Sequence, residues 1–561
     1  MSLILGIDTG GTYTDAVIVK KDSNEVMSKA KSFTTHDDLT KGISQCINML
    51  QIDKPSDISE IHISTTLAVN SILERKFEKI GLLQIDKAIA ECPPANYVMT
   101  INDPFAGNRK LMGMEKLPEI LDIRKTFTGN VDYIVVTSPA GTEAKWIEHQ
   151  IAERVRRDAD VEVFCAADYS SAEDYTERTI TSMLKLYLLP VVDQWIKSVE
   201  AIIMEKGINA QLRIMNAMGK LISCDEARKN PLSTMFSGLA ASVIGGLGLT
   251  DIRNFLLIDI GGTSSDITRI IDRQFHEVKE WTKIGKFSIR ERTMDVQTFG
   301  IGGDSHIRIT PLGNVIAGPK KAIPICIMTN KYPYLLDELE QCKRPDNYEM
   351  LTVQDVDCFI GVKDHSQVDI TEAEREIVEY LVDAPHNVFA IADHFDRDPD
   401  ALHLDDLIRK GVLRVISVTP TDVLHAEKKY TQWDTKGANI AIKHMAKQLK
   451  ITKAECIETI KDAITEKLIR SCMQSIANFE KEEFDFEESL GAGFMLERFC
   501  GRKNSMLGMK FKINKPIVAL GAPSGAWIDR VAKALDTEVV VPEHGEVANA
   551  YGTAIAEQMR G

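Results

Sequence analysis

Hydrophobic and polar positions follow two periodicities along the N-terminal part of the chain. Short apolar runs typical of strands alternate with amphipathic stretches typical of helices, a pattern that indicates an α/β domain. The predicted strands and helices are Leu3–Ile7, Ala16–Val19, Glu60–Ser64 and Tyr133–Thr137, and Asp38–Leu50 and Thr142–Arg157. A longer helical stretch, Asp174–Lys206, begins at acidic residues and is predicted to break near Pro190.

One pattern occurs twice: an apolar strand that ends in Asp, a Gly-Gly turn, hydroxyl residues, and a second Asp that leads into another apolar strand. The copies are Leu5–Asp15 and Ile258–Asp266. A turn built on glycine has no Cβ atoms, so its backbone N–H groups can surround an anion. A single copy would equally suit a structural turn, but the repeat predicts two facing lobes that bind the phosphates of a nucleotide.

The acidic residues of the repeat suggest a metal ion. A carboxylate beside a phosphate is repelled unless a cation such as Mg²⁺ lies between them. The predicted catalytic residues are therefore Asp8, Asp15, Asp259 and Asp266. The predicted phosphate-binding residues are Thr9, Gly10, Gly11, Thr12, Thr14, Gly261, Gly262, Thr263 and Ser264.

The two hairpins resemble the phosphate-1 and phosphate-2 motifs of the actin, sugar-kinase and Hsp70 superfamily. Val518–Trp527 is similar to the adenosine motif of that superfamily. This resemblance implies that ATP binding also involves Gly521, Ala522, Pro523 and Ser524. Val547–Ala556 resembles the final connecting helix, whose small residues permit close packing at the hinge between the lobes.

Within this superfamily the chain resembles the hydantoinase A/oxoprolinase family, over about residues 1–325 and 505–561. The family-like segments are Ile63–Lys76, Asn230–Ala241 and Gly300–Ser305. Leu239 stands where the family usually has proline, and Asp304 where it usually has glycine. The last segment adds Gly302 and Gly303 to the expected cofactor-binding residues.

The resemblance implies a two-lobed, actin-like ATPase with ribonuclease H-like duplicated lobes and an inserted helical module. The expected divisions are a first lobe over 1–211, a second lobe over 212–335, the module over 336–418, and the rest of the second lobe over 419–561.

The inserted module has a winged-helix-like pattern. A capping box at Thr371-Glu372-Ala373-Glu374 predicts a helix to about Val382, followed by helices at Val388–Phe395 and Pro399–Arg409 and a strand at Val412–Val418. The third helix, the candidate recognition helix, carries three acids ahead of its basic residues, which disfavours contact with DNA phosphates. A lid or a partner-docking surface is the preferred interpretation.

A second metal site is predicted from two Asp/His pairs. Asp422 and His425 share a face if a helix begins there, and a glycine-rich loop supplies Asp304 and His306. Two imidazoles and two carboxylates suit Zn²⁺ or Mn²⁺. In the alternative interpretation, Asp422 caps a helix and both histidines form only local hydrogen bonds.

Composition and charge disfavour several classes of protein, including nucleic-acid-binding and disulfide-rich proteins. The chain has 561 residues, a net charge of −15 and ten cysteines without a Cys-x-x-Cys pair. The negative charge repels nucleic acid and anionic membranes, and the cysteine spacing disfavours a disulfide framework or a cysteine zinc knuckle. Without a basic signal region or an apolar run long enough to cross a bilayer, the chain is predicted to be cytoplasmic.

The predicted activity follows from the nucleotide site and the resemblance together. ATP would phosphorylate the amide oxygen of a cyclic amide, such as a hydantoin or a 5-oxoproline-like lactam, and water would then open the ring. The resemblance implies a second subunit of the hydantoinase B type, and a homo-oligomer is also open. The alternatives are a small-molecule kinase and an ATP-gated activator or chaperone of a partner enzyme.

Overall fold

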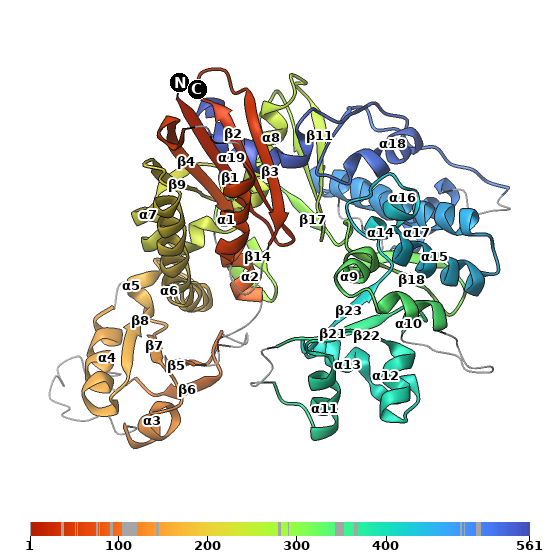
Figure 1. The fold of residues 1–561 in the computed structure, drawn as a ribbon. Coiled ribbons are helices and arrows are strands. Elements are labelled where there is room, and N and C mark those ends of the chain that lie inside the picture. Colours follow the sequence, from red (N-terminus) through yellow and green to blue (C-terminus); the bar gives the residue numbers. More distant parts are fainter. Residues whose placement is uncertain are drawn as a thin grey trace. The chain divides into compact units, whose positions relative to one another are not determined.

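The chain folds into two compact units, which are described separately. The structure is a computed structural model that describes residues 2–34, 39–50, 52, 54–73, 77, 79–89, 94–103, 120–141, 145–278, 282–289, 291–342, 353–363, 368–482, 485–486, 489–500 and 506–560. Unit 1 comprises Met1–Gly248, His276–Asp295 and Asn549–Gly561, and unit 2 comprises Leu249–Phe275 and Val296–Ala548 (Figure 1).

The main sheet of unit 1 has six strands in the order β10-β9-β4-β1-β2-β3. In chain order they are β1 (Leu3–Thr9), β2 (Tyr13–Lys20), β3 (Val26–Phe33), β4 (Ile58–Thr65), β9 (Gln211–Met215) and β10 (Leu221–Ser223). The first three strands form an antiparallel meander, and β4 and β9 continue the sheet in parallel. The four predicted strands are confirmed as β1, β2, β4 and β7 (Tyr133–Thr137), the last of them in another sheet.

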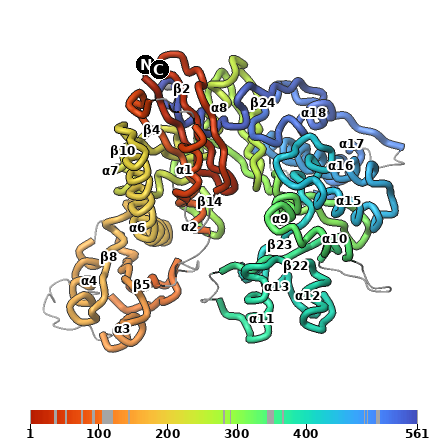
Figure 2. The backbone as a smooth tube through the Cα atoms, viewed as in Figure 1, coloured from red at the N-terminus to blue at the C-terminus, as the bar shows by residue number. Residues whose placement is uncertain are grey.

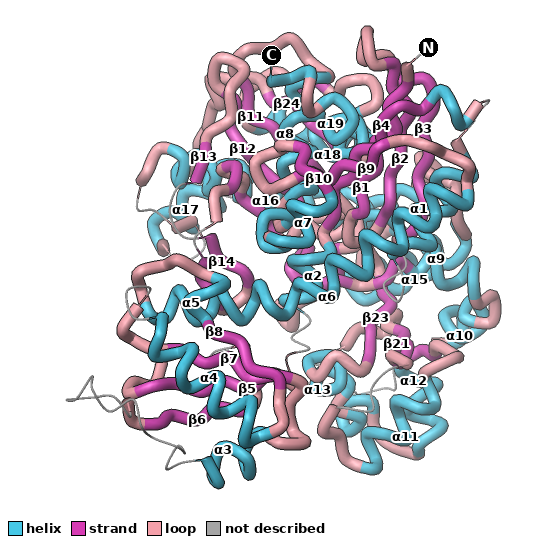
Figure 3. The backbone as a smooth tube through the Cα atoms, turned by 90° about the vertical axis from the view of Figure 1, so that its left-hand side faces the viewer, coloured by secondary structure: helices cyan, strands magenta, loops and turns pink. Residues whose placement is uncertain are grey.

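That other sheet of unit 1 has four parallel strands in the order β6-β5-β7-β8 (Figure 3). Its remaining strands and its helices are β5 (Ile80–Ile85), β6 (Tyr97–Ile101), β8 (Glu162–Cys165), α3 (Ile120–Phe127), α4 (Lys145–Ala159) and α5 (Ala166–Tyr169). Leu83 and Val136 pack with α3 and α4, whereas Leu82 and Val135 pack with α6 (Tyr175–Glu205). Side chains alternate between the faces of a strand, so both faces of this sheet are covered.

Helix α6 corrects one sequence prediction. The helix was expected to break near Pro190, but it runs without interruption over 31 residues with Pro190 inside it. Its start is as expected, because the Asp174 side chain caps the helix by accepting a hydrogen bond from the N–H of Glu177. Residues on both sides of the proline, including Leu188 and Val192, are buried. This packing outweighs the backbone hydrogen bond that proline removes, a loss of about 3 kcal/mol or more.

Small residues bring three elements of unit 1 close together. A Cβ atom on Gly6 of β1 would lie 2.3 Å from the carbonyl oxygen of Ala550 in α19 (Ala548–Ile555). A Cβ atom on Gly552 of α19 would lie 2.0 Å from the carbonyl oxygen of Ala241 in α8 (Ser237–Gly248). The predicted close packing of the final helix is therefore confirmed within unit 1.

The main sheet of unit 2 repeats the strand pattern of unit 1. Its order is β17-β12-β11-β24-β25, with β11 (Phe255–Ile260), β12 (Ser265–Ile270), β17 (Gln297–Phe299), β24 (Ile517–Leu520) and β25 (Val539–Val540). The first three strands in chain order are antiparallel, and the last two add in parallel, as in unit 1. The predicted duplication is thus present in the topology, with one hairpin in each unit.

Helices form most of the remainder of unit 2 (Figure 2). They are α9 (Ile325–Lys331), α10 (Leu335–Gln341), α14 (Pro420–Ala426), α15 (Thr435–Leu449), α16 (Lys453–Phe479), α17 (Leu490–Phe499) and α18 (Ser524–Ala534). Buried residues of α15, α16 and α18 share one hydrophobic core with the sheet. Among the described residues, no helix is both long and apolar enough to cross a bilayer.

The inserted segment forms a small α/β module with its own core. It contains α11 (Glu372–Leu381), α12 (Val388–Phe395) and α13 (Leu404–Arg409), beside a sheet in the order β20-β23-β21-β22. Those strands are β20 (Ile323–Pro324), β21 (Cys358–Gly361), β22 (His386–Asn387) and β23 (Leu413–Ser417). The capping box at Thr371 is confirmed. The expected third helix divides at His403, whose φ of 50° is left-handed.

The basic residues of the candidate recognition helix pair with acids of the module. Arg409 forms an ion pair with Asp406, and Lys410 Nζ lies 2.7 Å from Glu374 Oε1. Charges that are already paired within the protein are less available to phosphates.

One expected domain boundary differs from the structure, and the ends of three expected segments lie outside the described residues. The second lobe was expected to start at residue 212, but β9 pairs with β4 in the sheet of unit 1, which therefore continues to Gly248. The start of the helix expected at Asp38, the start of the helix expected at Thr142, and the end of the family-like segment at residues 74–76 lie outside the described residues.

The close approach of β1 and α19 yields a stability prediction. Gly6→Ala would force the two elements apart, so we expect the free energy of unfolding to fall by about 1–3 kcal/mol, typical of overpacking. Urea denaturation followed by circular dichroism measures the change. Gly493→Ala is the matched control, because a Cβ atom there meets nothing within 4 Å. Equal effects of the two substitutions would contradict the packing argument.

Candidate functional site

The hairpin of unit 1 places its two acids opposite each other. Asp8 on β1 pairs with Asp15 on β2, and Thr9 pairs with Thr14. The turn closes through the N–H of Gly10, which donates to the carbonyl oxygen of Tyr13 at 3.0 Å. A Cβ atom on Gly11 would meet nothing within 4 Å. The backbone at the tip of the turn is therefore open to a ligand.

Asp8 is buried and held by hydroxyl groups. It is 3% exposed, and Ser64 Oγ donates to its Oδ1 at 2.6 Å. Ser64 Oγ also lies 2.8 Å from Thr553 Oγ1 of α19. A Cβ atom on Gly238, at the start of α8, would lie 3.5 Å from the same Asp8 oxygen. The Ser64 hydroxyl thus holds this carboxylate, and the start of α8 lies beside it.

Sequence reasoning missed the supporting roles of Ser64, Thr553 and Gly238. Each lies in a segment that the family resemblance had already marked, but far from Asp8 in sequence. Only the sheet and the helix contacts bring them together. The parallel pairing of Asp8 with Ser64 is the signal that could have found the first of them, because neighbouring strands place paired residues side by side.

Asp15 differs from Asp8 because it has a cationic partner. Lys31 Nζ on β3 donates to both carboxylate oxygens, at 2.7 and 3.0 Å. The ion pair neutralises the second acid of this hairpin. This ion pair gives Asp15 a structural role in addition to its predicted catalytic role.

The hairpin of unit 2 has the same strand register as the hairpin of unit 1, but its second acid, Asp266, has a shifted pKa. Asp259 pairs with Asp266, and the N–H of Gly261 donates to the carbonyl oxygen of Ser264 at 2.9 Å. Burial, and then the charge of Asp259, raises the pKa of Asp266 to about 7. Thr298 Oγ1 donates to Asp266 at 2.7 Å and partly offsets this shift. A cation beside this pair would favour ionisation of both acids.

A glycine-rich loop packs against this second turn. Gly303 N–H donates to the carbonyl oxygen of Gly261 at 3.0 Å, and Asp304 N–H donates to that of Gly262 at 2.6 Å. A Cβ atom on Gly302 would lie 2.7 Å from both carbonyl oxygens. The structure thus brings Gly302 and Gly303 to the hairpin, in agreement with their grouping in the sequence prediction.

The turn after β24 also packs against the hairpin of unit 2. Gly521 has a φ of +89°, and a Cβ atom on it would lie 2.1 Å from the carbonyl oxygen of Ile260 and 3.0 Å from Asp259 Oδ1. The Pro523 ring lies 3.7 Å from the Cβ position of Gly303. Parallel strands β11 and β24 end together, and such strand ends commonly form ligand crevices in α/β sheets.

The donor set of these turns fits a magnesium-bound phosphate ligand. Carboxylates of Asp259 and Asp266 offer the oxygen ligands that Mg²⁺ prefers, and the hydroxyls of Thr263 and Ser264 in the turn suit phosphate oxygens. The glycines leave backbone exposed where any side chain would intrude. The residues present therefore fit the predicted cofactors.

The predicted second metal site is wrong in its Asp422/His425 half. Asp422 is fully buried and accepts hydrogen bonds from the N–H groups of Ile325 and Cys326, at 3.2 and 2.7 Å, and from Thr419. His425 Nδ1 lies 2.8 Å from the carbonyl oxygen of Thr421, and its Nε2 accepts from the N–H of Trp433. Both side chains are occupied by structural hydrogen bonds, as the alternative interpretation held.

The Asp304/His306 half does not complete a metal site either. His306 Nε2 lies 3.4 Å from Asp357 Oδ1, and both side chains are buried. Among the described residues, the one group of three or more metal-binding side chains is His149, Cys165 and Asp168. The four predicted ligands therefore do not form one group of metal-binding side chains.

Comparisons with known proteins agree with this geometry. The hydantoinase/oxoprolinase N-terminal region matches residues 4–90, and the hydantoinase/oxoprolinase family itself matches residues 178–323. The first match contains the hairpin of unit 1 and Ser64, and the second contains the hairpin of unit 2 and the loop at Gly302.

Three similar proteins illustrate the match. Caprolactamase subunit alpha of Pseudomonas jessenii is 26% identical over 57% of this chain and 50% of its own length. Acetone carboxylase beta subunit of Xanthobacter autotrophicus is 24% identical over 57% and 50%. A nucleotide-free structure of an ATP-dependent acetone carboxylase is 16% identical with a TM-score of 0.64, covering 99% of this chain and 70% of that chain. The alignments with the two sequence relatives thus span half of each relative.

The raised pKa of Asp266 predicts a pH dependence of stability. The pKa of an aspartate rises from 3.8 in the unfolded chain to about 7 here, so the folded state binds more protons between these values. Stability from this group therefore falls as pH rises from about 4 to 7. We expect Asp266→Asn, which keeps the Thr298 hydrogen bond, to be stabilising relative to the unchanged chain, and more so at pH 8 than at pH 5.

Thermal unfolding at both pH values measures this difference. Asp15→Asn is the control at the equivalent position of unit 1. We expect it to destabilise at both pH values, because it removes the charge that pairs with Lys31. A loss of stability for Asp266→Asn that is the same at pH 5 and pH 8 would contradict the charge argument.

Proposed function

We propose that the chain is a member of the hydantoinase/oxoprolinase family, whose models match residues 4–90 and 178–323, and that it catalyses the ATP-dependent activation of a cyclic amide for ring opening. The observation that carries the proposal is the duplicated hairpin, with acids paired across a glycine turn in each unit. Similarity to caprolactamase subunit alpha favours a lactam as the substrate class.

The chemistry explains why ATP is needed. An unstrained amide is stabilised by resonance, and its nitrogen is a poor leaving group. A phosphoryl group on the amide oxygen makes the carbon far more open to attack by water. ATP would supply this phosphoryl group, and Mg²⁺ would neutralise the charge on its oxygens.

The residues of the two units have distinct proposed roles. Asp259 and Asp266 would hold Mg²⁺ through oxygen ligands, and the turn around Gly262 would offer backbone and hydroxyl groups to phosphate. The turn at Gly521 gives backbone access for adenosine. In unit 1 the N–H groups and hydroxyls of Thr9–Thr14 would contact phosphate, and Asp8, fixed by Ser64, would orient the hydrated cation.

A partner is part of the proposal. Two similar proteins are named as subunits, caprolactamase subunit alpha and acetone carboxylase beta subunit. A second subunit of the hydantoinase B type would complete hydrolysis of the activated amide. We propose that the inserted module around α11–α13 is a docking surface for such a partner.

ATP hydrolysis stimulated by a cyclic amide tests the proposal. We expect release of ADP to increase when caprolactam, 5-oxoproline or a hydantoin is added with Mg²⁺. Asp8→Asn should lower the stimulated rate by at least about a hundredfold, because electrostatic groups at phosphoryl-transfer sites contribute on this scale. Asp22→Asn is the control, an exposed aspartate in the turn after β2 of the same unit.

The products separate the alternatives. A ring-opened amino acid supports amide hydrolysis, whereas a stable phosphorylated product indicates a small-molecule kinase. If Asp8→Asn removed turnover but the chain still activated a partner enzyme, the ATP-gated activator would be the correct class. If none of the cyclic amides changed ADP release, with or without the partner, the proposed substrate class would be wrong.

A further inference from the structure

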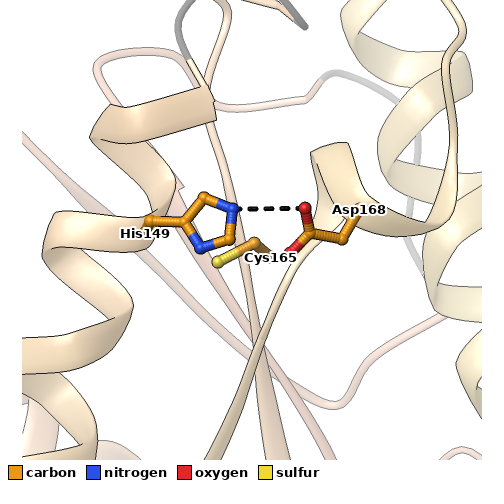
Figure 4. Close-up of side chains that lie close together, drawn as sticks. All are labelled: His149, Cys165 and Asp168. Carbon is orange, nitrogen blue, oxygen red and sulfur yellow. Dashed lines mark hydrogen bonds and ion pairs between the residues drawn. The ribbon is translucent and has the colours of Figure 1, made fainter.

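A cluster of three potential metal ligands lies outside the hairpins, at the edge strand of the four-stranded sheet of unit 1. The residues are His149 on α4, Cys165 at the end of β8 and Asp168 on α5. One ligand atom from each of them lies within 4.8 Å of the other two. Figure 4 shows the imidazole, the thiol and the carboxylate turned toward one another.

We propose that His149, Cys165 and Asp168 bind a zinc-class divalent cation with a fourth coordination position open to water. Imidazole nitrogen, thiolate sulfur and carboxylate oxygen are the ligand types of protein zinc sites. Tetrahedral coordination at the usual bond lengths separates ligand atoms by about 3.3–3.6 Å. His149 Nε2 and Asp168 Oδ1 are already 3.2 Å apart, so small side-chain movements would suffice.

Exposure of the three ligands indicates an open site. The Cys165 residue is 2% exposed, whereas the side chains of His149 and Asp168 are 48% and 41% exposed. The sulfur thus lies on the protein side, and the other two ligands lie at the surface. Three protein ligands with solvent on one side resemble catalytic zinc sites rather than closed structural ones.

The buried carboxylate of Glu148 fixes the backbone around the cluster. Glu148 Oε2 accepts from the N–H of Ala167 at 2.8 Å, and its Oε1 accepts from the N–H of Ser138 at 2.9 Å. These bonds tie the first turn of α5 to α4 and to the end of β7. Because Cys165 and Asp168 lie within two residues of Ala167, Glu148 positions both of them relative to its neighbour His149.

The charges around the cluster favour a cation. Burial is the main cause that raises the pKa of the Cys165 thiol, and the charges of Glu148 and Asp168 add to it, whereas Arg156 lowers it. The same negative charges would stabilise a divalent cation at the sulfur. On binding, the thiol releases its proton to solvent and the sulfur takes its place as a metal ligand.

Metal competition tests the proposal without any measurement of enzyme activity. The full-length protein, free of any polyhistidine tag and stripped with a chelator, is titrated with Zn²⁺ against a chromophoric chelator. We expect one ion per chain and release of a proton on binding. Co²⁺ in place of Zn²⁺ should give a near-ultraviolet sulfur-to-metal charge-transfer band, which reports the thiolate ligand directly.

Variants assign the ligands. Cys165→Ser should abolish the charge-transfer band and weaken Zn²⁺ binding by at least about tenfold, given that even outer partners of metal ligands contribute 10–100-fold. Asp168→Asn, at a half-exposed position, should weaken binding similarly and serves if Cys165→Ser fails to fold. Cys224→Ser, a partly exposed cysteine elsewhere in unit 1, is the matched control and should bind as the unchanged chain does.

Two outcomes would overturn the proposal. One is a chain that binds no Zn²⁺ above the level of the chelator competition. The other is a Co²⁺ band or a Zn²⁺ affinity that Cys165→Ser and Asp168→Asn leave unchanged. The assay uses no nucleotide or amide, so failure of the proposed ATP-dependent activity would not alter its result.

Discussion

The pairing of two aspartates across a glycine turn is the constraint on which the rest of this structure depends. Antiparallel pairing places directly opposed side chains on one face of a sheet, so the acids of each hairpin face the same way. Asp8 with Asp15 and Asp259 with Asp266 repeat this arrangement in the two units. Each pair concentrates negative charge at a buried strand end, and the surroundings must compensate for it.

The two units compensate in different ways. Around the unit 1 hairpin, Lys31 neutralises Asp15 and the Ser64 hydroxyl donates to Asp8. Around the unit 2 hairpin, burial and the charge of Asp259 raise the pKa of Asp266 to about 7, so ionisation of both acids is disfavoured. The pair in unit 2 is therefore the one whose ionisation a bound cation would change most. The two similar hairpins therefore differ in how strongly a bound cation would affect the ionisation of their acids.

Glycines determine what can approach these acids. Gly302 and Gly521 bring two further turns into contact with the backbone of the unit 2 hairpin, at distances that no side chain would permit. In unit 1 the close contact of Gly6 with α19 brings Thr553 to Ser64, and through it to Asp8. The His149, Cys165 and Asp168 cluster belongs to a separate sheet and is organised by a different buried acid, Glu148.

The sequence alone determined the elements whose signals are local. The two hairpins, the strand at Tyr133–Thr137, the N-cap at Asp174 and the capping box at Thr371 follow from short-range periodicity, turn residues and side-chain hydrogen bonds. Tertiary structure decided the rest, because packing and pairing join residues far apart in the chain. Packing kept α6 continuous through Pro190, strand pairing assigned β9 to unit 1, and buried hydrogen bonds gave Asp422 a structural role. No local pattern joins His149 to Cys165, since the pairing of β8 with β7 and the hydrogen bond from Ala167 to Glu148 bring α4 and α5 together.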